Sequence, residues 1–155
     1  MEIRKAELSD IPELTTLGEK LIRYHEKLDR DYYQIKQEFH RYYETFLKEQ
    51  LVNQHVYFLI AEENNRIIGF NISYLKPLFS WFVISTVGHI SFIYVDDNFR
   101  GKKVGKKLIE QTVSWFREKG VKYIETFVDE NNFPGKNAWK SYGFKEFKKY
   151  LRFDF

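Results

Sequence analysis

Apolar residues recur at helical spacing in two long segments near the start of the chain. Residues 11–28 and 32–51 each place an apolar side chain every three or four positions, which is typical of a helix with one buried face. Asp10 and Glu13 have the spacing of a capping box at the start of the first helix, with Ser9 as a competing cap. Two later helices are predicted over residues 103–119 and 134–142, because Gly120 and Gly143 follow them as suitable helix ends.

Runs of β-branched and aromatic residues predict the strands. The stretch from Pro77 to Val95 has no charged residue, but its composition and Gly88 favour buried strand structure over a membrane span. We therefore expect a long strand over residues 83–95, bent near Gly88. The other expected strands cover residues 2–7, 56–61, 67–75, 123–128 and 144–153, with a hairpin turn at residues 62–66.

The order of these elements defines the expected fold. The order β-α-α-β-β-β-α-β-α-β places a strand, helix, strand unit after an antiparallel meander. It predicts an α/β (α+β) fold with a mixed, mostly antiparallel central sheet flanked by helices on both faces. Because no repeat, linker or low-complexity run interrupts the chain, we expect residues 1–155 to form a single domain.

Composition narrows the class of protein. The chain has no cysteine, which excludes disulfides, cysteine zinc sites and thiol nucleophiles, and its four histidines lack the spacing of metal ligands. With 25 Lys and Arg against 22 Asp and Glu, the net charge of +3 gives no indication of nucleic-acid binding. Since the N-terminus has no apolar signal segment, we expect a cytoplasmic protein without a membrane partner.

A polar turn between a strand and a helix carries the most informative pattern. The strand ends at Val95, and Arg100-Gly101 and Gly105 then lead into the helix. A helix N-terminus has unpaired N–H groups and partial positive charge that attract phosphate, and glycines permit close main-chain approach. The alternative is a pair of ordinary turn glycines before a solvated lysine face. The spacing is neither that of a P-loop nor that of a dinucleotide-binding loop.

Two motifs give the chain a resemblance to a known family. The run Arg100-Gly101-Lys102-Lys103-Val104-Gly105 resembles the acetyl-CoA signature [QR]-x-x-G-x-[GA] of the GNAT N-acetyltransferases. The segment from Asn132 to Phe144 resembles their second signature, N-x-x-A-x-x-[LF]-Y-x-x-x-G-F. The resemblance covers essentially the whole chain. It implies transfer of acetyl from acetyl-CoA to a primary amine by direct attack in a ternary complex, which agrees with the absence of cysteine.

The resemblance also implies which residues bind acetyl-CoA. The turn would hold the pyrophosphate, and the strand end would pair with the pantetheine through main-chain groups. Trp139 stands where the family has a tyrosine that protonates the leaving thiolate, and an indole is not a usable acid, so we expect it only to pack against the pantetheine. Lys103 stands where the signature prefers glycine. The expected cofactor residues are Ile93, Tyr94, Val95, Arg100, Gly101, Lys102, Lys103, Val104, Gly105, Lys106, Asn132 and Trp139.

Three residues are candidates for the reaction itself. The resemblance implies that the main-chain N–H of Ile93 stabilises the thioester oxygen as it becomes negative. His89 aligns with the glutamate base of histone-acetylating members, and an imidazole accepts a proton near neutral pH. The alternatives are a structural histidine and a base that acts through water. Tyr142, one helical turn after Trp139, is a candidate for the missing acid, with core packing as its alternative.

The sequence does not determine the acceptor. Small amines and polyamines, aminoglycosides, amino acids, and peptide or protein amines all stay open. Because the first two helices line the amine pocket in the family, the candidate substrate residues are Tyr24, His25, Glu26, Asp29 and Tyr32, with a solvated helix end as the alternative. Formation of a homodimer through the last strand or the long uncharged segment also stays open.

Two other functions compete with catalysis. Loss of the family tyrosine at Trp139 also suits a non-catalytic module that binds acyl-CoA. The lysines of residues 100–107, with aromatic residues nearby, also suit nucleic-acid binding, although the small net charge argues against it.

Overall fold

A five-stranded mixed sheet forms the centre of the computed structural model, which describes residues 1–155. The strands lie in the order β1-β2-β3-β4-β5; β1 to β4 are antiparallel neighbours, and β5 is parallel to β4. This arrangement confirms the predicted fold class. The strands are β1 (Glu2–Lys5), β2 (Val56–Glu63), β3 (Arg66–Pro77), β4 (Thr86–Val95) and β5 (Ile124–Thr126).

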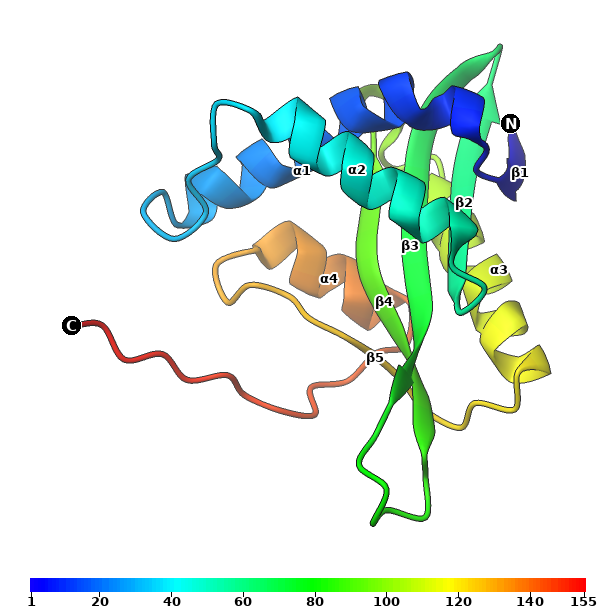
Figure 1. Cartoon of the computed structure of the whole chain (residues 1–155), viewed down its shortest axis with the longest axis vertical. Helices are drawn as coiled ribbons and strands as arrows, with labels where there is room; N and C mark the ends of the chain where they lie inside the picture. Colours follow the sequence, from blue (N-terminus) through cyan, green and yellow to red (C-terminus); the bar gives the residue numbers. More distant parts are fainter.

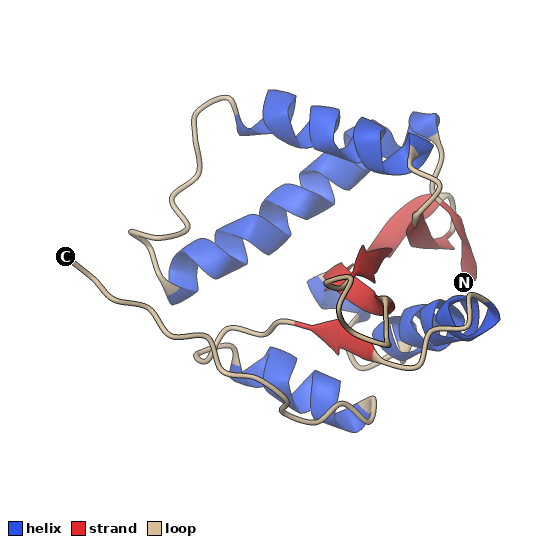
Figure 2. Cartoon of the chain, turned by 60° about the horizontal axis from the view of Figure 1, so that its bottom comes forward, coloured by secondary structure: helices blue, strands red, loops and turns tan.

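Helices cover both faces of the sheet. On one face lie α1 (Ile11–Leu28) and α2 (Phe39–Val52), and on the other lie α3 (Val104–Glu118) and α4 (Phe133–Ser141) (Figures 1 and 2). Adjacent residues of a strand point to opposite faces: Phe58 of β2 packs under α1 and α2, whereas Leu59 packs under α3. None of the helices is both long enough and apolar enough to cross a membrane.

Two predicted elements differ most from the structure: one helix begins later than predicted and one strand is absent. The second helix begins at Phe39 and not at residue 32, because Asp29 ends α1 and its carboxylate accepts the Tyr32 N–H at 3.2 Å, forming a turn. The strand predicted over residues 144–153 is absent: the chain runs without regular structure from Phe144 to its end (Figure 1). Three lysines interrupt the apolar pattern there, and Arg152 instead binds Asp29 at 2.6 Å.

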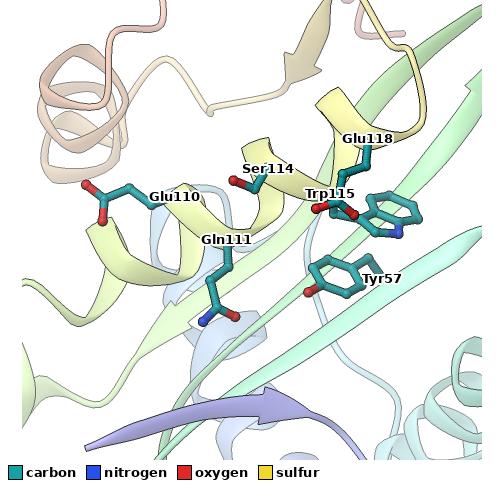
Figure 3. A pocket seen from close by; sticks show the side chains of 6 residues that line it. All are labelled: Tyr57, Glu110, Gln111, Ser114, Trp115 and Glu118. Carbon is teal, nitrogen blue, oxygen red and sulfur yellow. The ribbon is translucent and has the colours of Figure 1, made fainter.

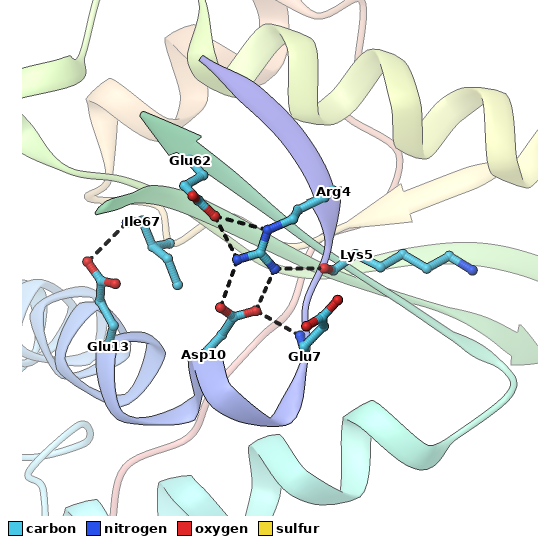
Figure 4. A network of polar contacts seen from close by, with 7 residues as sticks. All are labelled: Arg4, Lys5, Glu7, Asp10, Glu13, Glu62 and Ile67. Carbon is cyan, nitrogen blue, oxygen red and sulfur yellow. Dashed lines mark hydrogen bonds and ion pairs between the residues drawn. The ribbon is translucent and has the colours of Figure 1, made fainter. Parts of the chain in front are cut away.

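The predicted capping box is also wrong. The Asp10 carboxylate accepts two hydrogen bonds from Arg4, at 2.8 and 2.9 Å, and one from the Glu7 N–H at 2.8 Å (Figure 4). Glu13 accepts the Ile67 N–H at 3.0 Å. The acidic residues at the start of α1 therefore attach the helix to the sheet and do not satisfy its own N–H groups. The Arg4 guanidinium holds the pKa of Asp10 below its usual range.

The long uncharged segment forms the end of β3, a connection over residues 78–85, and β4. Its irregularity lies at Ser91 and not at Gly88: Ile72 pairs with Phe92 while Ser73 pairs with Ile90, which leaves Ser91 unpaired as a β-bulge. Gly88 serves packing, because a Cβ built on it would lie 2.8 Å from three atoms of the Phe116 ring.

We expect Gly88→Ala to destabilise the protein by about 1–3 kcal/mol, because Phe116 is fully buried and must shift to make room. Urea unfolding measures the loss. Combining Gly88→Ala with Phe116→Leu creates space for the new methyl group, so the double variant should lose less stability than the sum of the two single variants. Strict additivity would contradict this packing relation.

Candidate active site

The sheet opens along the second half of β4. Gly88, His89 and Ile90 pair with β5 on one side and with β3 on the other. Residues 92–95 pair with β3 alone, since β5 ends at Thr126 (Figure 1). A free strand edge of this kind exposes main-chain groups that an extended ligand can pair with.

The bulge at Ser91 decides which main-chain groups face the opening. The Gly88 N–H donates to Tyr123 O at 2.9 Å, so even-numbered residues before the bulge face β5. The Asp96 N–H donates to Ile68 O at 2.8 Å, so even-numbered residues after the bulge face β3. Because hydrogen-bonding direction alternates along a strand, the N–H groups of Ile93 and Val95 point into the opening.

Asp96 anchors the turn that follows β4. Its side chain is almost fully buried, accepts the Asn98 N–H at 3.1 Å, and lies 3.1 Å from Lys20 Nζ and 3.3 Å from Arg66 Nη2. Burial alone would raise the pKa of Asp96, but the hydrogen bond from Lys20 and the other contacts outweigh it, so the pKa lies below its ordinary value. One carboxylate thus connects α1, β3 and the turn.

The turn presents a row of unpaired main-chain donors. None of the N–H groups of residues 101–106 donates to a protein acceptor, and the first bond of α3 runs from the Lys107 N–H to Lys103 O at 3.1 Å. Gly101 and Lys103 have positive φ angles of 76° and 63°, which turn the chain into α3. Six consecutive donors at a helix N-terminus fit the oxygen atoms of a pyrophosphate.

Cationic side chains surround this row, and some already have partners. Arg100 Nη2 lies 2.8 Å from Asp97 Oδ1, and Arg100 Nε donates to Val95 O at 3.3 Å. Lys102 lies over the Phe99 ring, and Lys106 lies 3.9 Å from Glu110. Arg100 therefore also stabilises the turn itself, a role that the sequence pattern did not indicate.

Helix α4 brings Tyr142 to the start of α3. A Cβ built on Gly105 would lie 2.6 Å from the Tyr142 hydroxyl and 3.6 Å from Val95 Cγ2, so this glycine leaves room for the phenol. Burial raises the pKa of Tyr142, which keeps the hydroxyl protonated at neutral pH. Trp139 packs edge-on against Tyr142 and Phe144 and belongs to the core between α3 and α4.

Asn132 has a structural use at the start of α4. Its Oδ1 accepts the Gly135 N–H at 2.9 Å and the Tyr24 hydroxyl at 3.2 Å, so it caps α4 and joins it to α1. Tyr33 makes a second bridge, from its hydroxyl to Asp129 at 3.4 Å. These two contacts hold the end of α1 against the segment that follows β5.

His89 is buried on the α1 side of the sheet. The residue is 3% exposed, and its ring lies 5.0 Å from the rings of Tyr74 and Phe127 and has no partner at Nδ1. Burial lowers the pKa of His89; Lys76 acts in the same direction and Glu125 opposes it. The imidazole is therefore neutral at pH 7 and able to accept a proton.

The candidate acceptor residues separate into two groups. Tyr24 contacts the His25 ring edge-on, and His25 and Tyr32 each contact the Tyr33 ring edge-on near the end of α1. Glu26 lies 3.5 Å from Arg23 on the same helix, and Asp29 binds Arg152. Sequence reasoning missed Asp129 and Arg152, because their contacts with Tyr33 and Asp29 join positions 96 and 123 residues apart and have no local pattern.

A separate hollow of about 290 Å³ lies on the outer face of α3, away from the opening of β4. The stacked rings of Tyr57 and Trp115 line it together with polar residues of the helix (Figure 3). It contains none of the residues expected to bind acetyl-CoA or an amine. No group of three His, Cys, Asp or Glu side chains is placed to hold a metal ion.

Comparison with known proteins agrees with this geometry. The model of the acetyltransferase (GNAT) family matches residues 21–144, most of the chain, and the chain belongs to that family. No curated protein matches the sequence.

Solved structures show the same fold. A tetramutant of the BH1408 protein from Bacillus halodurans is 22% identical, with a TM-score of 0.90 and all of both chains covered. Aminoglycoside 6′-N-acetyltransferase AAC(6′)-IG from Acinetobacter haemolyticus is 18% identical, with a TM-score of 0.80 over 99% of this chain and 97% of that one. A predicted acetyltransferase with acetyl-CoA from Clostridium acetobutylicum is 22% identical, with a TM-score of 0.73 over 99% and 95%.

The contact between Gly105 and Tyr142 generates a stability test. We expect Gly105→Ala to destabilise the protein by about 1–3 kcal/mol, because the methyl group overlaps the phenol oxygen. In a Tyr142→Phe background the same change should cost clearly less, since the overlapping atom is gone. Denaturant unfolding of the four proteins measures the coupling, and equal costs in both backgrounds would show that the two residues do not touch.

Proposed function

We propose that the protein is an N-acetyltransferase that moves the acetyl group of acetyl-CoA to a primary amine. The observation that carries the proposal is the row of free N–H groups at residues 101–106 beside the open edge of β4. The row suits the pyrophosphate, and the N–H groups of Ile93 and Val95 suit an extended pantetheine that lies along the strand. Tyr94 lies between them, with its side chain in the core.

The residues divide the chemistry among them. The amine nitrogen attacks the thioester carbon; the new N–C bond forms, the C–S bond breaks, and the amine loses one proton while the thiolate gains one. The Ile93 N–H stabilises the charge that develops on the thioester oxygen. His89 takes the amine proton through water, because four residues of strand separate it from Ile93, roughly 13 Å at about 3.3 Å per residue. Tyr142, protonated and with its hydroxyl beside Gly105, supplies a proton to the thiolate.

The experiment that tests the proposal measures binding and turnover separately. Calorimetry should detect CoA binding, and labelled acetyl-CoA should acetylate at least one member of a panel of primary amines. The panel includes aminoglycosides, because one structural neighbour is an aminoglycoside acetyltransferase. Binding of CoA without turnover on any amine would favour the alternative, a non-catalytic acyl-CoA module, which the replacement of the family tyrosine by Trp139 suggests. Absence of CoA binding would reject both.

His89→Gln should lower kcat by roughly 10²–10⁴-fold, as removal of a general base does, with little change in the Kd for CoA. Because burial holds the pKa of His89 below its ordinary value near 6.5, the acid limb of the parent rate profile should lie below pH 6.5 and disappear in the variant. Stability depends on pH in the same direction. The contribution of neutral His89 to the free energy of unfolding is complete above pH 6.5 and declines as the pH falls toward the folded-state pKa. A variant with the parent's pH profile would make His89 a structural residue.

Tyr142→Phe should lower kcat, because it removes the hydroxyl that protonates the thiolate and keeps the ring and its packing. Trp139→Tyr restores the family's acid and should recover turnover in that background. Steady-state kinetics with one fixed amine compares the four proteins. A silent Tyr142→Phe together with a faster Trp139→Tyr would show that solvent protonates the thiolate in the parent.

A further inference from the structure

A buried polar cluster lies between the sheet and α3, behind the open half of β4. Asn71 of β3, Ser73 of β3 and Thr112 of α3 are all fully buried. Ser73 Oγ donates to Asn71 Oδ1 at 2.8 Å. Thr112 Oγ1 lies 2.9 Å from the same oxygen and 2.9 Å from Leu108 O, and its one proton serves either acceptor. Asn71 Nδ2 donates to the Phe92 carbonyl at 3.1 Å. A buried amide is costly unless its partners are in place, and here they are.

The orientation of the Asn71 amide follows from its partners. The Phe92 carbonyl can only accept a hydrogen bond, so the nitrogen of the amide must face it. The two hydroxyl groups, which can donate, surround the oxygen. A flipped amide would place two acceptors against each other, 3.1 Å apart. The cluster therefore keeps the Asn71 amide in one orientation, with Nδ2 donating to β4.

The carbonyl that Asn71 holds belongs to the peptide unit of the Ile93 N–H. The chain has no cis peptide bond, so the Phe92 C=O and the Ile93 N–H point in opposite directions from one plane. The carbonyl faces Asn71, and the N–H faces the opening of β4. This peptide lies next to the unpaired Ser91, where the ladder is interrupted and less able to fix a peptide plane.

We propose that Asn71 is a positioning residue for acetyl transfer: it fixes and polarises the peptide unit whose N–H, on Ile93, stabilises the thioester oxygen. The proposal rests on the proposed function and adds a residue to it. A hydrogen bond to a peptide carbonyl strengthens the donor at the other end of the same unit. Thr112 connects this device to α3, whose N-terminus carries the free N–H groups of residues 101–106. Helix α3 thus helps to position both the pyrophosphate and the thioester of acetyl-CoA.

The main test replaces Asn71 with leucine, which has similar size and no donor. Asn71→Leu should lower kcat by about tenfold or more, short of the roughly 10²–10³-fold lost when an oxyanion donor is removed outright. The Kd for CoA should stay close to that of the parent, because CoA has no thioester oxygen. Thr15→Val is the matched control: it removes another buried hydroxyl, which donates to Ile11 O at 2.8 Å on α1, and should leave kcat unchanged.

Asn71→Asp provides a second test, which does not require the protein to fold with leucine at position 71. A buried carboxyl group has a raised pKa, and its protonated form can donate to the Phe92 carbonyl as the amide does. The ratio of variant to parent kcat should therefore be near one at low pH and fall as the pH rises and the donor ionises. A ratio that stays at one over the whole range would overturn the proposal.

The peptide itself can be observed by labelling isoleucine with ¹⁵N. In the parent, acetyl-CoA should move the Ile93 amide proton downfield more than CoA does, and Asn71→Leu should reduce that difference. An unchanged difference with an unchanged kcat in a folded Asn71→Leu protein would overturn the role of Asn71 alone. A parent that shows neither the shift nor turnover would overturn the proposed function, and this inference with it.

Discussion

The unpaired Ser91 on β4 changes the direction of every main-chain group that follows it. Before the bulge, the main-chain N–H and C=O groups of even-numbered residues face β5. After the bulge, those of even-numbered residues face β3. Since β5 ends at Thr126, the odd-numbered N–H groups beyond the bulge have no protein partner across the opening. Interruption of the ladder at one residue, together with the short β5, thus leaves free main-chain donors along an edge of the sheet.

The buried carboxylate of Asp96 holds the turn that follows this strand edge in place. Asp96 keeps its carboxylate ionised because Lys20, Arg66 and the Asn98 N–H surround it, and their attraction exceeds the cost of burial. The turn and the strand end therefore move together with α1 and β3. Since the folded-state pKa of Asp96 is depressed, its contribution to stability is present above the unfolded pKa and is lost as the pH falls through the folded value.

The elements that the sequence predicted well are those with strong periodicity or strong chemistry. α1, α3, the β2–β3 hairpin and the turn at residues 100–105 lie where the apolar spacing and the glycines place them. The errors fall where a distant partner decides the outcome. Residues 32–38 have helical spacing, yet Asp29 turns the chain there, and the last segment loses its strand while Arg152 binds Asp29.

The candidate site residues follow the same division. The sequence predicts the turn at residues 100–105 because its signal is local, and it indicates Ile93 through resemblance to the family. It gives no indication of the Tyr33–Asp129 bridge or of the partners of Asn71, which come from β4 and α3. The one local sign of Asn71 is an amide in the middle of the apolar run from Ile67 to Leu75. A polar residue in such a run marks a place where tertiary contacts must satisfy it.

The partners of Asp96 also bear on the order in which the molecule assembles. The β2–β3 and β3–β4 pairs are hairpins, so their contacts close short loops and can form first. Lys20 and Asp96 are 76 residues apart, and Arg4 and Glu62 are 58 apart, so both ion pairs require the central hairpins to be present already. We therefore expect the turn at residues 96–103 to become ordered late in folding, after the sheet that it serves.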